Sequence, residues 1–145
     1  MKIIIKTKNV ELGDEMKNYI QKKISPLEKF VKRIYNDKYF VGRDKPRIEA
    51  FVEIEKETLH HKKGPYFKAE CQIVFPGQNI IAKSETYNIE QAIDNVRDEI
   101  QGEIKKVKEK VVARVKRGAR IFKKDLRLAP EAKFFRKGRI REEGI

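Results

Sequence analysis

The sequence has few of the residues that form disulfides or bind metals: its 145 residues include one cysteine and two histidines. The single cysteine, Cys71, excludes an internal disulfide, which favours a reducing compartment. Because the adjacent His60 and His61 lack a second pair of ligands, we expect no metal site. The opening apolar run, Ile3–Ile5, is too short for a signal-peptide core or a membrane span. These absences predict a soluble, cytoplasmic protein that does not associate with membranes.

Acidic residues are outnumbered by basic ones. The chain holds 35 Lys and Arg against 22 Asp and Glu, a formal net charge of +13, which makes a polyanion the leading class of partner. Residues 116–145 hold eleven bases and four acids, so about half of the excess lies there. This shift in composition predicts a compact domain at residues 1–115 and a basic C-terminal arm at residues 116–145.

Apolar periodicity predicts the order β-α-β-β-β-α, an α+β fold with a four-stranded sheet and both helices on one face. The last three strands are expected to form an antiparallel meander, with Cys71 in the core. Pro26 should break or kink the first helix near Ser25, and Gly118 should end the second. The expected strands are residues 2–7, 47–57, 66–75 and 79–85, and the expected helices run from Asp14 to about Ile34 and from a cap at Asn88 to Gly118.

Basic side chains gather on the solvent-facing sides of both predicted helices. In the first helix, Lys22, Lys29 and Arg33 lie opposite the apolar stripe, with Lys32 beside them. In the second helix, the charged residues of the first half are mostly acids, and those of residues 105–117 are mostly bases. That order also complements a helix dipole, so it is equally consistent with a purely structural role. The bases that continue beyond the predicted helix favour a binding surface.

Apolar residues are interleaved with the bases of the arm, among them Phe122, Phe134 and Phe135. A purely electrostatic tail needs no such residues. Aromatic rings beside Arg suit stacking on unpaired bases or docking into a groove on a partner. Packing on the protein's own sheet is the alternative, and both remain open at this point.

No set of residues forms a catalytic constellation. The acids of the second strand have no histidine placed to act with them as a general acid and base. The turn at residues 76–78 lacks the lysine and glycine spacing of a nucleotide-binding loop. The loop at residues 60–65 instead presents Lys62 and Lys63, which suit contact with phosphate. We expect a binding protein that is not an enzyme and uses no cofactor.

Four short motifs, in a fixed order over residues 1–110, resemble a known family. They are Asn9–Leu12 before the first helix, Pro26–Phe30 within it, HHKKGPYFKAE at residues 60–70, and Gln91–Asp94 in the second helix. On these motifs the chain resembles the ribosome hibernation-promoting factor family, also described as ribosome-associated inhibitors or sigma-54 modulation proteins. The resemblance implies a fold akin to double-stranded-RNA-binding domains. It also implies binding in the small-subunit channel where mRNA and tRNA sit, which blocks initiation and stores idle ribosomes.

The resemblance further implies that bases on both helices contact rRNA. Lys23 and Arg33 match basic positions of the family's first helix, and Lys106, Lys108 and Lys110 match those of the second. Together with the other bases on the solvent-facing sides, the candidate rRNA-binding residues are Lys22, Lys23, Lys29, Lys32, Arg33, Lys62, Lys63, Lys105, Lys106, Lys108, Lys110, Arg114, Lys116, Arg117 and Arg120.

The chain departs from the family pattern in two places. Glu99 and Gly102 occupy positions where relatives often carry Lys and Arg, and residues 111–145 do not resemble the dimerisation domain of long-form members. The resemblance is therefore to a short form, which we expect to be monomeric and to reach ribosomal proteins through its arm. Two other functions stay open: a generic double-stranded-RNA-binding or RNA-chaperone module, and a protein-interaction regulator of a transcription factor.

Overall fold

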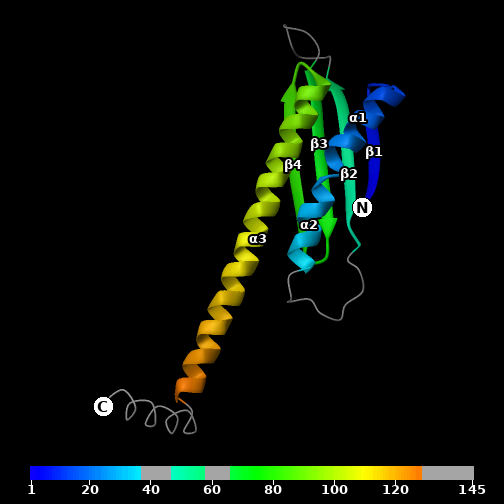
Figure 1. Ribbon diagram of the computed structural model, residues 1–145. Coiled ribbons are helices and arrows are strands. Elements are labelled where there is room, and N and C mark those ends of the chain that lie inside the picture. Colours follow the sequence, from blue (N-terminus) through cyan, green and yellow to red (C-terminus); the bar gives the residue numbers. More distant parts are fainter. Residues whose placement is uncertain (37–46, 58–65, 129–145) are drawn as a thin grey trace, which may run out of the picture. The chain divides into compact units, whose positions relative to one another are not determined.

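The structure, a computed structural model, describes residues 1–36, 47–57 and 66–128. The chain forms two compact units, Met1–Val107 and Lys108–Ile145. Its elements, labelled in Figure 1, are β1 (Lys2–Lys8), α1 (Asp14–Ile24), α2 (Leu27–Asn36), β2 (Glu49–Glu57), β3 (Tyr66–Phe75), β4 (Gln78–Thr86) and α3 (Ile89–Leu128). The first unit contains the sheet, α1, α2 and the first half of α3. The predicted loop at residues 60–65, with Lys62 and Lys63, lies outside the described residues, as do Phe134 and Phe135.

The four strands form one sheet in the order β1-β2-β3-β4. β1 pairs with β2 in parallel because α1 and α2 carry the chain back between them. β2, β3 and β4 pair antiparallel, which confirms the predicted meander. The β3–β4 connection turns at Pro76 and Gly77, where Gly77 adopts a φ of +80° that residues with a side chain rarely reach.

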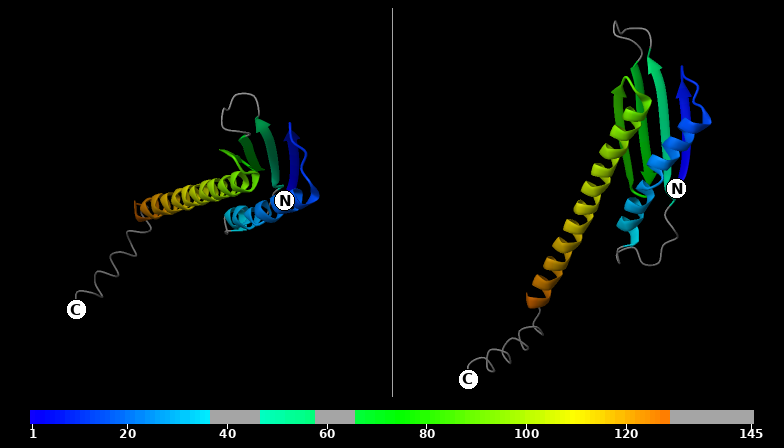
Figure 2. Two further views of the ribbon diagram at one scale, coloured as in Figure 1. Left: turned by 90° about the horizontal axis from the view of Figure 1, so that it is seen from above. Right: turned by 45° about the horizontal axis from the view of Figure 1, so that its top comes forward.

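The helices of the first unit lie on one face of the sheet (Figures 1 and 2), so the α+β prediction is confirmed. Alternate residues of β2 and β3 point into the core, because successive side chains of a strand face opposite sides. Cys71 is among them, as predicted. The buried apolar residues are Ile20, Ile24, Leu27, Val31, Ile34, Ile48, Ala50, Val52, Ile54, Ala69, Cys71, Ile73, Phe75, Ile80, Ala82, Ala92, Ile93, Val96, Ile100 and Ile104.

The predicted break in the first helix is confirmed: α1 ends at Ile24 and α2 begins at Leu27. Pro26 has no N–H to donate to the carbonyl four residues before it, so the helical ladder is interrupted there. The Ser25 N–H still donates to the Gln21 carbonyl at 2.9 Å, and the Lys29 N–H donates to the Pro26 carbonyl at 3.2 Å. The buried stripe continues through both helices, so the opposite sides of α1 and α2 remain facing solvent.

The second predicted helix begins as expected but does not end as expected. At its start, the Asn88 side-chain oxygen accepts a hydrogen bond from the Glu90 N–H at 2.9 Å, which caps α3. At Gly118 the prediction is wrong, because α3 continues to Leu128. A glycine ends a helix by adopting positive φ, and among the described glycines only Gly77 does so. Inside a helix Gly118 costs about 1 kcal/mol relative to alanine, which the Lys, Arg and Ala residues around it offset.

Candidate nucleic-acid interface

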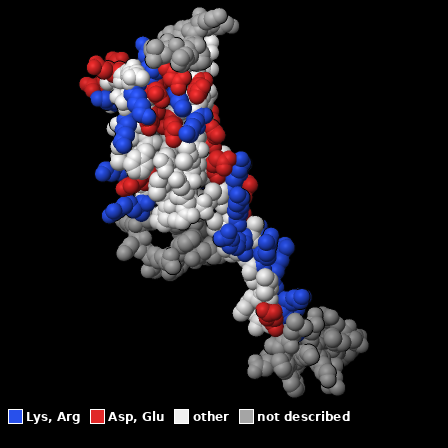
Figure 3. All heavy atoms as spheres, turned by 180° about the vertical axis from the view of Figure 1, so that it is seen from behind, with Lys and Arg blue, Asp and Glu red and all other residues white. Residues whose placement is uncertain are grey.

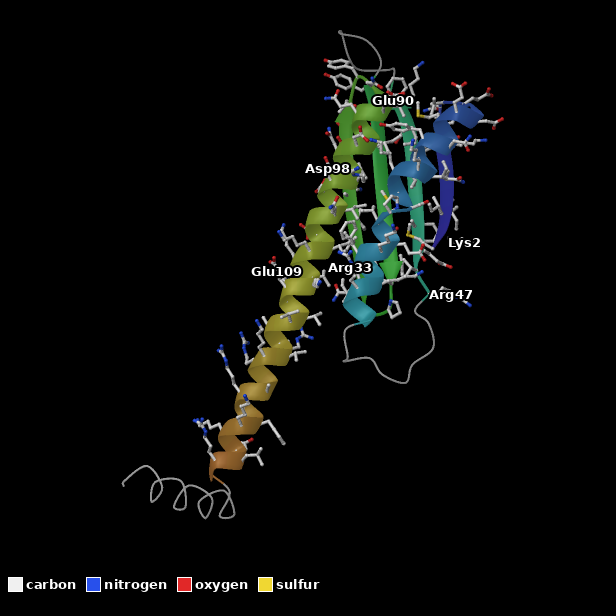
Figure 4. All side chains as sticks on the ribbon, in the orientation of Figure 1. Lys2, Arg33, Arg47, Glu90, Asp98 and Glu109 are labelled. Atoms are coloured by element: carbon white, nitrogen blue, oxygen red, sulfur yellow. The ribbon has the colours of Figure 1, made fainter. Side chains whose placement is uncertain are left out.

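The outer side of α1 and α2 presents three exposed bases. Lys22, Lys29 and Arg33 form no ion pair with any residue that the structure describes. Arg33, near the end of α2 (Figure 4), has its guanidinium carbon 5.7 Å from the centre of the Phe30 ring. Lys32 differs from these three, because its amine lies 2.8 Å from the Glu28 carboxylate one turn earlier. The first helical region therefore offers three exposed cations that no carboxylate of the described residues pairs with.

Lys23, in contrast, is used inside the first unit. Its amine lies 2.9 Å from a carboxylate oxygen of Asp94 in α3 and 5.2 Å from the centre of the Tyr19 ring. The Tyr19 hydroxyl donates to the other oxygen of Asp94 at 3.0 Å, so the three side chains link α1 to α3. The sequence gives no signal for this cluster, because Tyr19 and Asp94 lie 75 residues apart and meet only through packing.

The cluster has a defined pH dependence. The hydrogen bond and charge of Asp94 raise the pKa of the Lys23 amine, and Lys23 lowers the pKa of the Asp94 carboxyl. A lowered carboxyl pKa contributes stability that is present at neutral pH and is lost as pH falls through that lowered pKa. Since the Asp94 side chain is 41% exposed, solvent screens the pair and its contribution to stability is small.

The part of α3 in the first unit carries both bases that pair with a described acid and bases that do not. Lys105 is exposed and forms no ion pair with a described residue, whereas the Lys106 amine lies 2.6 Å from the Glu103 carboxylate. Glu99 and Gly102, where the resemblance implies bases, are both exposed on this stretch. A β-carbon placed on Gly102 would meet no atom within 4 Å, so a larger side chain fits there without a clash.

The part of α3 in the second unit is strongly basic. At 100° per residue, its bases fall mainly on one side of the helix, opposite a row of apolar residues. The only acids at residues 108–127 are Glu109 and Asp125. Three of its bases, all beyond the expected helix end at Gly118, were absent from the predicted set. The bases of this stretch are Lys108, Lys110, Arg114, Lys116, Arg117 and Arg120, which belong to the predicted set, and Lys123, Lys124 and Arg127, which do not; all are exposed except Lys108, which is half-buried.

The open face of the sheet has a different charge pattern. Figure 3 views this face and shows acidic and basic side chains intermixed beside an uncharged area. Lys8 lies 2.5 Å from Glu53, and Lys83 lies 3.0 Å from Glu70. Because acids and bases neutralise one another here, this face is not suited to a polyanion.

The described residues offer no alternative chemical centre. None of their acids, histidines and cysteines form a group of three or more that could hold a metal ion. Cys71 is fully buried, and burial raises the pKa of its thiol to about 12, so it stays protonated at neutral pH. The helices within these ranges are not long and apolar enough to cross a membrane.

Comparison with known proteins points in one direction. The family model described as "Sigma 54 modulation protein / S30EA ribosomal protein" matches residues 3–112. The ribosome hibernation promoting factor of Pseudomonas putida strain KT2440 is 24% identical over 110 residues, which cover 76% of this chain and 89% of that protein.

Two solved structures share the fold. The N-terminal domain of Thermus thermophilus protein Y is 22% identical, with a TM-score of 0.55 and coverage of 74% of this chain and 99% of that one. A ribosomal subunit interface protein from Coxiella burnetii is 16% identical, with a TM-score of 0.50 and coverage of 75% and 99%. With the family model matching most of the sequence, these comparisons show that the chain belongs to the Sigma 54 modulation protein / S30EA ribosomal protein family.

Proposed function

We propose that the chain binds the small ribosomal subunit through its rRNA, in the channel of mRNA and tRNA, and blocks initiation by occlusion. The observation that carries this proposal is the distribution of cations. Bases without an ion pair to a described residue lie along α1, α2 and α3, whereas on the open sheet face acids and bases are intermixed and two of the bases, Lys8 and Lys83, are paired. Family membership and the hibernation-factor name of the P. putida relative support the ribosome as the polyanion.

Binding of this kind requires bases held on a folded surface and involves no chemical reaction. Each Lys or Arg that neutralises a phosphate releases condensed counterion, which drives association. Lys22, Lys29 and Arg33 break no ion pair with a described residue on binding, and the pairs of Lys32 and Lys106 are screened by solvent and cost little to open. Lys23 is the weakest candidate because contact with phosphate would compete with Asp94. A ribosome-bound factor of this kind acts in the cytoplasm, as a monomer, without a cofactor.

Competition with the normal occupants of the channel tests this function. Small subunits are saturated with the chain, and the binding of mRNA and initiator tRNA is then measured by filter retention. Both should fall in proportion to occupancy and recover at high salt, where the phosphate contacts weaken. An excess of duplex RNA should leave the chain bound to the subunit, whereas it would displace a generic duplex binder. Full binding of mRNA and tRNA to saturated subunits would contradict occlusion.

Gly102→Arg should strengthen binding to the small subunit. The position is exposed and a β-carbon there meets open space. The family resemblance implies a base at this position. One additional phosphate contact should raise affinity roughly fivefold to tenfold. Gly102→Ala is the matched control: both variants should raise the melting temperature, because glycine costs a helix about 1 kcal/mol relative to alanine, but only arginine should raise affinity. Equal affinities of the two variants would place this stretch of α3 away from rRNA.

A further inference from the structure

The second half of α3 has an apolar side that the proposed rRNA contacts leave unused. At 100° per residue, Val111, Val115, Phe122 and Leu126 fall within one third of the helix circumference, which we call the apolar arc. Val111 and Val115 are half-buried, while Phe122 is 65% and Leu126 is 50% exposed. Lys110, Arg117 and most of the other bases of this stretch lie on the opposite side. The helix is therefore amphipathic, with one basic side and one apolar side.

The protein's own core does not require the apolar arc. Among the described residues, every fully buried apolar side chain lies at or before Ile104. The match to the family model ends at residue 112, so Val115, Phe122 and Leu126 stand outside the region that the family shares. Large apolar side chains at a spacing of about one turn are typical of a helix that lies in a groove on another protein.

The charge of this helix limits which partner could cover the apolar arc. Residues 108–127 hold nine bases and two acids, so a second copy of this helix would bring cations against cations. A phosphate backbone suits the basic side but offers nothing to Phe122 and Leu126. An apolar groove with an acidic rim satisfies both the apolar arc and the bases at its borders, Arg114, Lys116 and Lys123.

We propose that the apolar arc docks into an apolar, acid-rimmed groove on a protein of the small ribosomal subunit, while the basic side of the same helix rests on rRNA. This inference depends on the proposed function, since it places the groove on the subunit that the first unit binds. Phe122 and Leu126 are the anchors, because they are the most exposed large members of the arc.

The test compares intact small subunits with their protein-free rRNA. The double variant Phe122→Ala and Leu126→Ala removes both anchors and keeps the helix, since alanine has high helix propensity. Its affinity for intact subunits should fall about tenfold or more, from the loss of two buried apolar side chains, while its affinity for protein-free rRNA stays at the wild-type value. Ile81→Ala is the matched control: Ile81 is 47% exposed on β4 and lies on the open sheet face, away from both proposed contacts, so its loss should change neither affinity.

Each other outcome overturns the inference in a distinguishable way. If the wild-type chain does not bind small subunits, the proposed function fails with it. If the wild type binds and the double variant binds equally well, only the docking of the apolar arc fails. An equal loss on protein-free rRNA would assign the arc to RNA. Self-association of the wild type in sedimentation would assign the arc to a second copy, and binding to phosphatidylglycerol vesicles would assign it to a lipid surface. Either assignment requires that the double variant lose that association and keep full affinity for the subunit.

Discussion

Replacement of Lys22, Lys29 and Arg33 by glutamine in one variant should lower affinity for the small subunit about a hundredfold. Each side chain is exposed and has no internal ion pair with a described residue, so its charge is available to phosphate. At about 1 kcal/mol for each contact, three lost contacts give this factor. Because exposed substitutions scarcely change stability, the melting temperature should move by no more than about 4 °C. Affinity is measured over a range of salt concentrations and melting by circular dichroism.

A variant with the same change of charge on the other side of the sheet is the control. Lys2, Lys6 and Lys83 are exposed on β1 and β4, so their replacement by glutamine removes three charges away from the proposed interface. This control should keep affinity within a fewfold of wild type. The helix variant should also reduce the steepness of the plot of log affinity against log salt concentration. Its slope should change by about 2 to 3, because one phosphate contact is lost with each base. Equal losses in the two variants would show that net charge alone, without a defined interface, governs binding.

Ile20→Asp should abolish the folded state. Ile20 is fully buried where α1 packs on the sheet, and no base among the described residues lies in that core. An unpaired carboxylate there costs more than about 4 kcal/mol, a large part of the roughly 5–15 kcal/mol that stabilises a domain of this size. The cooperative melting transition should disappear. Asn18→Asp, which adds the same charge at an exposed position of α1, should melt close to wild type; a cooperative transition in Ile20→Asp near that temperature would contradict the packing described above.

Much of the fold could be predicted because local patterns determine it. The alternation in β2 and β3 gives their buried faces, Pro26 breaks the first helix by removing a donor, and Asn88 caps α3 with its side chain. The end of α3 could not be predicted in this way. Glycine permits positive φ without requiring it, so Gly118 is compatible both with a helix end and with a helix interior.

The exposure of the bases at the candidate interface could be predicted from the sequence, but their ion pairs within the protein could not. The solvent-facing positions of Lys22, Lys29 and Arg33 follow from helical periodicity. The engagement of Lys23 with Asp94 does not, because it depends on how α1 packs against α3. The contact of each base with rRNA depends on a partner that lies outside the chain, so the assignment of these residues stays a prediction.

The position of the chain on the small subunit, determined by cryo-electron microscopy of the complex, tests the central claim most directly. The account predicts density for the sheet and its helices within the channel of mRNA and tRNA, with α1 and α2 turned toward rRNA and the open sheet face turned away from it. Density bound elsewhere on the subunit, with the channel left open, would contradict occlusion.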